Sequence, residues 1–213
     1  MTALITRHAR NGIGHTISQQ LRGGRLALCA VAAILLASHA VHAQPPSRVI
    51  DDPFADGSWQ LELSGLWTAE AWNYNISREL LYGGFVGLTY VVRDGIALTA
   101  GAPLYYASQR GVDGYVLGAT VGVRGRVYRT KRATMFVGVE VGVSEADTFV
   151  PPRGTRFNYL ALGSAGAVMR VSNAVHLLGA FKWVHVSNNG LAGRHRNPDI
   201  EALGAQASVL IAF

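Results

Sequence analysis

A histidine, a serine and a glutamate lie within residues 181–201, and together they could perform ester hydrolysis. His185 and Ser187 are two positions apart in an alternating apolar run, and a polar loop separates them from Glu201. Side chains at i and i+2 of a β-strand share one face, so His185 and Ser187 are expected side by side. If the next run pairs antiparallel, Glu201 returns beside them. Ser, His and a carboxylate are the parts of a hydrolytic triad.

Residues 1–43 are predicted to be a secretory signal peptide that is removed. Four arginines and no acidic residue precede a twelve-residue apolar run, 26–37, which is too short to span a bilayer. Cleavage is expected after Ala43, with Ala40 as the next best position. Cys29 lies in the apolar run, so the mature chain has no cysteine and no thiolate metal site.

The mature chain has the size of one domain and little net charge. It carries 15 basic and 13 acidic residues, about +2, because four arginines belong to the leader. The high isoelectric point therefore gives little support to a nucleic-acid partner. No set of His and carboxylate residues has metal-ligand spacing, so neither a metal nor a cofactor is expected.

The rest of the chain is predicted to be all-β. Residues 44–56 are polar and are expected to form an extended lead-in to a barrel over 57–213. Eight alternating runs follow, joined by connections that are alternately tight and mostly longer. This pattern is typical of an eight-stranded antiparallel transmembrane barrel of the bacterial outer membrane, with periplasmic termini. The predicted strands are 57–69, 81–93, 95–107, 113–128, 133–146, 155–170, 174–187 and 201–213.

The alternation also predicts which face each side chain occupies. Apolar residues of every run are expected to face lipid, and polar residues are expected to pair with one another inside a narrow barrel. The alternative is a soluble β-sandwich, which would bury the apolar face instead. The chain ends on Phe213, in phase with the apolar set, which resembles the signal read by the outer-membrane barrel-assembly machinery. The expected interior set is Glu62, Arg124, Arg126, Glu140, Lys182 and Gln206.

The same phase places the triad on the outer wall, at the end with the longer loops. An ionisable group there is costly and indicates function, and the substrate within reach is lipid of the outer leaflet. Asn188, or the backbone N–H groups near Gly190, could stabilise the oxyanion. Arg194 and Arg196, in the adjoining loop, either contact lipid phosphates or form a solvated face.

The residues of this hairpin resemble the catalytic hairpin of the PagL-type lipid A 3-O-deacylases. The shared pattern is His185-x-Ser187-Asn188, then Gly-Leu, then Asn197 and Ile-Glu201. The resemblance implies hydrolysis of the ester-linked 3-hydroxyacyl chain of lipid A in lipopolysaccharide, without a cofactor. The interval to the glutamate is about two residues longer here than in the family, which leaves Asp199 as a rival acid.

Two other functions are compatible with the sequence. A non-enzymatic barrel, structural or adhesive, would use its loops to bind a partner. An acyltransferase or phospholipase barrel would use the same outer wall for another lipid reaction. The sequence leaves open whether the chain forms a homodimer.

Overall fold

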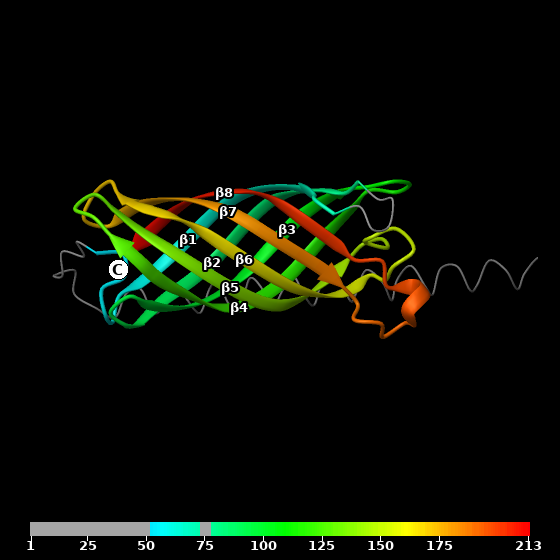
Figure 1. Ribbon diagram of the computed structural model, residues 1–213, viewed down its shortest axis with the longest axis horizontal. Coiled ribbons are helices and arrows are strands. Elements are labelled where there is room, and N and C mark those ends of the chain that lie inside the picture. Colours follow the sequence, from blue (N-terminus) through cyan, green and yellow to red (C-terminus); the bar gives the residue numbers. More distant parts are fainter. Residues whose placement is uncertain (1–51, 73–77) are drawn as a thin grey trace, which may run out of the picture. The chain divides into compact units, whose positions relative to one another are not determined.

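The computed structural model describes residues 52–72 and 78–213, and in this part of the chain eight antiparallel strands close into a barrel (Figure 1). The strands pair in sequence order, and the first pairs with the last. The predicted fold class is confirmed, and each strand lies within two residues of its predicted bounds. The strands are β1 (Trp59–Glu70), β2 (Leu80–Arg93), β3 (Ile96–Ser108), β4 (Gly114–Arg129), β5 (Ala133–Ala146), β6 (Phe157–Arg170), β7 (Val175–Ser187) and β8 (Ile200–Ala212).

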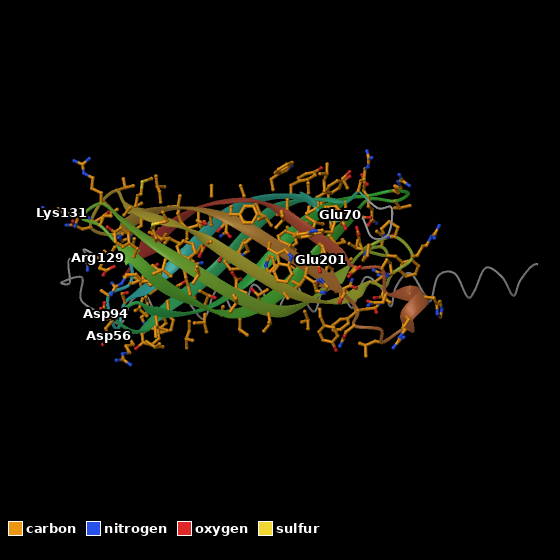
Figure 2. All side chains as sticks on the ribbon, in the orientation of Figure 1. Asp56, Glu70, Asp94, Arg129, Lys131 and Glu201 are labelled. Atoms are coloured by element: carbon orange, nitrogen blue, oxygen red, sulfur yellow. The ribbon has the colours of Figure 1, made fainter. Side chains whose placement is uncertain are left out.

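The two ends of the barrel differ in their connections. The short-turn end carries residues 94–95, 130–132 and 171–174. The long-loop end carries 71–72, 78–79, 109–113, 147–156 and 188–199. A short 3-10 helix, η2 (Arg194–Arg196), lies in the last of these loops. Figure 2 shows the labelled Asp56, Asp94, Arg129 and Lys131 at the short-turn end, whereas Glu70 and Glu201 lie toward the long-loop end.

The predicted signal peptide and residues 44–51 of the predicted lead-in lie outside the described residues. Within the described ranges, no helix has the length and apolar character needed to cross a membrane. Residues 52–56 of the predicted lead-in do not run extended but form turns against the short-turn end. Phe54 is buried there against Phe136, with ring centroids 6.4 Å apart, and its carbonyl accepts from Gly95 N–H.

The outer wall carries a belt of large apolar side chains that point away from the barrel. Val121, Val139 and Val141 are each at least 60% exposed, and Phe181 and Trp67 are each 55% exposed. A water-soluble protein rarely exposes apolar surface on this scale. The alternation that produces the belt is the one expected for strands whose outer side faces lipid, and it contradicts the soluble sandwich.

The inner face of the strands holds buried ion pairs, as the alternation predicts. Arg124 Nη2 lies 3.0 Å from Glu62 Oε2, and Lys182 Nζ lies 2.7 Å from Glu140 Oε1. Gln206 Nε2 donates to Glu62 Oε1 at 2.7 Å. These four charges thus have partners in an environment where an unpaired charge would be costly. Apolar clusters lie toward both ends, so side chains fill the barrel.

Arg126 departs from the predicted interior network. Its guanidinium pairs with Asp52 and Asp94, each at 2.6 Å, rather than with the polar residues at mid-barrel. Arg129 also pairs with Asp52, at 2.7 Å. The reason is position: Arg126 lies close to the short-turn end of β4, where the folded lead-in supplies Asp52 and the turn between β2 and β3 supplies Asp94. Strand periodicity does not reveal either contact.

Candidate active site on the outer wall

The register between β7 and β8 brings the predicted triad together. His185 and Glu201 are direct partners in this ladder, and Ser187 follows two positions later on the same face. The residues between and beside them point into the barrel and are at most 2% exposed, so the triad side chains point outward. Those inward neighbours are Val184, Val186, Ile200 and Ala202.

The three side chains form a continuous hydrogen-bonded chain. His185 Nδ1 lies 2.7 Å from Glu201 Oε1, and His185 Nε2 lies 3.1 Å from Ser187 Oγ. With the ring proton on Nδ1, the imidazole donates to the carboxylate and Nε2 is left to accept from the serine hydroxyl. The His185 and Glu201 side chains are about a quarter exposed, whereas Ser187 is only 7% exposed.

The structure adds Trp183 to this chain of contacts. Its indole Nε1–H donates to Glu201 Oε2 at 2.7 Å. Its ring is stacked on His185, with centroids 6.1 Å apart and planes inclined by 26°. The residue types and their spacing do not single out Trp183 from the other outward aromatic residues. Its phase was the available signal, because it lies two residues before His185 on the same strand face.

Asn188 is buried and anchors the loop that follows the serine. Its Nδ2 donates to Thr155 Oγ1 at 3.0 Å and to the Arg196 carbonyl at 2.5 Å. Its own N–H donates to Asn197 Oδ1, and its Oδ1 accepts from Gly190 N–H, both at 2.9 Å. The two predicted oxyanion donors, Asn188 and Gly190, are therefore both engaged within the loop.

Another backbone donor reaches the serine. Asn189 N–H points to Ser187 Oγ at 3.4 Å. Asn189 has φ 52° and Gly190 has φ 75°, so the chain turns sharply in the left-handed region directly after the strand. The sequence signal for this donor was the Asn-Asn-Gly run, which favours such a turn.

The two loop arginines lie close to the site but behave differently. Arg194 is exposed, in η2. Arg196 is also exposed, but its guanidinium donates to the Gly154 carbonyl at 3.3 Å and lies 5.5 Å from the centre of the Phe149 ring. Arg196 therefore ties the loop to residues 147–156, and contact of either arginine with lipid phosphates stays a prediction.

Asp199 lies near the triad but does not take the place of Glu201. Single ligand atoms of His185, Asp199 and Glu201 all lie within 4.8 Å of one another, so these three residues could hold a metal ion. This proximity was not expected from their spacing in the sequence. Both Glu201 oxygens already accept hydrogen bonds, from His185 and from Trp183. Glu201 therefore has its hydrogen-bond partners in the triad without a metal ion.

Comparison with known proteins supports the fold but not an activity. No family model matches the sequence, and no curated protein sequence matches it. Among solved structures, Neisserial surface protein A is 8% identical, with TM-score 0.51, over 73% of this chain and 94% of that one. The outer membrane protein OprG from Pseudomonas aeruginosa is 12% identical, with TM-score 0.49, over 74% and 96%. The N-terminal barrel domain of Pseudomonas aeruginosa OprF is 15% identical, with TM-score 0.47, over 74% and 98%.

This protein therefore has the fold of a small outer-membrane β-barrel. At these identities the likeness concerns the closed barrel alone. Function has to be argued from the residues on the outer wall.

Proposed function

We propose that this barrel is a serine ester hydrolase that acts on lipid from its outer wall. The observation that carries the proposal is the unbroken chain Ser187–His185–Glu201, at 3.1 and 2.7 Å, on a face otherwise occupied by apolar side chains. A purely structural barrel gains nothing from ionisable groups there, because an apolar setting penalises them.

The geometry supports a two-step hydrolysis. Ser187 Oγ attacks the ester carbonyl while its proton passes to His185 Nε2, and Glu201 holds the imidazole by Nδ1 and stabilises its positive charge. The proton on Nε2 then passes to the alkoxide oxygen of the departing alcohol, which leaves an acyl-serine. Water, deprotonated by Nε2, attacks this acyl-serine. The carboxylic acid then leaves as the proton passes from Nε2 back to Ser187 Oγ.

The tetrahedral oxyanion needs a donor next to the serine. Asn189 N–H lies near the nucleophile, 3.4 Å from Ser187 Oγ, and we assign it this role. Asn188 and Gly190 are engaged with each other and with the loop, so they support this turn. For Asn188 to donate directly, as the sequence suggested, its amide would have to leave Thr155 or Arg196.

The surroundings of the triad favour a substrate with long acyl chains. A shallow, largely apolar groove lies on the same outer wall, with small residues at its floor and Trp67 and Tyr82 beside it. It includes Ala205, four positions from Glu201 along β8, which corresponds to about 13 Å. One acyl chain of a lipid held at the triad can lie in this groove. The residues that line it are Gly65, Leu66, Trp67, Tyr82, Gly83, Ala205, Gln206 and Ala207.

The resemblance of the hairpin to the lipid A 3-O-deacylases names a specific substrate within this class. We propose that the ester cleaved is the 3-linked hydroxyacyl chain of lipid A, in the outer leaflet of a Gram-negative outer membrane. The two extra loop residues are compatible with this proposal, because Glu201 keeps its place opposite His185 and the insertion is confined to the loop.

Mass spectrometry of lipid A from cells that produce the wild-type barrel tests the proposal. The expected result is loss of one 3-hydroxyacyl mass with the wild type, none with Ser187→Ala, and full loss with Ser172→Ala as a matched control at the short-turn end. Loss of the chain with Ser187→Ala as well would rule out Ser187 as the nucleophile. Release of fatty acid from phospholipid instead would point to a phospholipase.

A second candidate is a structural or adhesive barrel without enzymatic activity, because the barrel fold by itself requires no reaction. In that case lipid A and phospholipid would stay unchanged in cells with a folded barrel, whichever residue occupies position 187.

A further inference from the structure

We infer that Trp183 is a positioning residue of the proposed triad. Its indole N–H fixes the carboxylate plane of Glu201, and the carboxylate in turn aligns the imidazole of His185. The inference rests on the proposed ester hydrolase and adds a fourth residue to its site, which neither the triad pattern nor the barrel fold requires.

The first argument is the division of the two carboxylate oxygens. Oε1 of Glu201 accepts from His185 Nδ1 at 2.7 Å, and Oε2 accepts from Trp183 Nε1, also at 2.7 Å. A carboxylate held through one oxygen can still rotate, whereas two donors on opposite oxygens fix its plane. Hydrogen bonds to a charged acceptor are among the stronger ones in proteins.

The second argument is the packing of the indole against both neighbours. The ring is stacked on His185 with centroids 6.1 Å apart. On the other side, Trp183 is the direct ladder partner of Gly163 on β6. A Cβ on Gly163 would lie 3.3 Å from Trp183 Cε3, so the indole lies over this glycine, and a larger residue there would displace the ring.

The third argument is the position of Trp183 along the strand. Along the outward face of β7 the order is Phe181, Trp183, His185, with His185 nearest the long-loop end. Trp183 therefore lies between the His185–Glu201 pair and the apolar belt, to which Phe181 belongs. The indole thus covers the side of the pair that faces the belt. Excluding water from that side strengthens the hydrogen bonds to the carboxylate.

An interfacial tryptophan without this role would look different. Trp59, at the other end of the barrel, packs on Tyr90 with centroids 4.6 Å apart. Trp59 is therefore the matched control, because Trp59→Phe makes the same chemical change on the same outer wall, away from the site.

Steady-state kinetics of the refolded barrel on lipid A, or on a soluble aryl ester, tests the inference. Trp183→Phe keeps an aromatic ring and removes the N–H donor. We expect kcat to fall roughly 10-fold or more, KM to stay within about twofold, and Trp59→Phe to match the wild type. In a Glu201→Ala background, Trp183→Phe should change kcat by less than about twofold, because residues that act through one another are not additive. An equal loss in both backgrounds would overturn the inference.

Gly163→Val provides a second route that leaves Trp183 unchanged. Displacement of the indole should reproduce the kcat loss of Trp183→Phe, and no loss would contradict the packing argument.

A spectroscopic measurement separates this inference from the proposed function. In 15N-labelled barrel in micelles, Glu201→Gln should shift the indole N–H signal of Trp183, identified by its absence in Trp183→Phe, and leave that of Trp59 in place. An unmoved Trp183 signal would overturn the inference whatever the activity. If Glu201→Gln shifts this signal but the wild-type barrel hydrolyses no ester, the proposed function is refuted and the hydrogen bond between Trp183 and Glu201 stands.

Discussion

Glu201 lies directly opposite His185 in the ladder between β7 and β8, with Oε1 and Nδ1 2.7 Å apart. The backbone register of β8 against β7 therefore places the Glu201 carboxylate next to the His185 imidazole. Asp199, two residues earlier, precedes Ile200, the first residue of β8, and so lies outside this ladder.

This relationship predicts which carboxylate the reaction uses. Glu201→Gln keeps the shape of the side chain but removes the charge that stabilises the protonated imidazole, and we expect kcat to fall by about 10³–10⁴-fold. Asp199→Asn should lower kcat far less. Initial rates of acyl release measure both, and the reverse order would identify Asp199 as the acid.

The loop after the serine should depend on the Asn188 amide. Asn188→Ala removes the donors to the Arg196 carbonyl and to Thr155 Oγ1 and the acceptor for Gly190 N–H. We therefore expect trypsin to cleave at Arg194 and Arg196 several-fold faster while the barrel stays intact. Asn189→Gly, which keeps the left-handed turn, serves as the control in the same loop. An unchanged cleavage rate for Asn188→Ala would show that other contacts hold the loop.

Stability should depend on the interior ion pairs. Arg124→Met leaves Glu62, 1% exposed, without its charged partner. We expect a loss of about 3–5 kcal/mol in the free energy of unfolding, as for other buried pairs broken on one side. Urea unfolding in lipid vesicles measures it, with Arg132→Met in a short turn as the control. Equal midpoints for the two variants would mean that Glu62 is satisfied without Arg124.

The long-loop end should loosen on acidification at one defined point. The Tyr106 hydroxyl, which donates to Asp113 at 2.6 Å, and then the Gln109 N–H lower the pKa of Asp113 below its usual range. Because this pKa is depressed, the stabilisation is present above the usual value for aspartate and is lost as the pH falls through the lowered one. The protection factor at Gln109, which is the exchange rate corrected for the intrinsic pH dependence of amide exchange, should therefore fall at low pH. Asp113→Asn should show that lower protection already at neutral pH. A protection factor that does not change with pH would contradict this link.

The barrel and the face of each triad residue could be predicted from the sequence, because both depend on local alternation. His185, Ser187 and Glu201 are in phase with apolar outward residues, and a period of two leaves only two faces to choose from. The interior pairs of Glu62 and Lys182 follow from the same rule.

The remaining features depend on contacts between residues far apart in the chain. Thr155 reaches Asn188 only because β6 pairs with β7, and Asp52 reaches Arg126 only because the lead-in folds back against the short-turn end. The outward face of Trp183 could be predicted from its position in the strand. Its hydrogen bond to Glu201 could be seen only in the side-chain geometry of the structure. Side-chain hydrogen bonds of this kind carry no periodic signal in the sequence.

Covalent labelling with a fluorophosphonate tests most directly whether Ser187 is an activated nucleophile. Mass spectrometry of peptides from the refolded barrel should locate the phosphonyl group on Ser187 in the wild type. Labelling should be lost in His185→Ala, because the hydroxyl then has no base to take its proton. A folded wild-type barrel that stays unlabelled, or that is labelled on a different serine, would contradict the proposed triad.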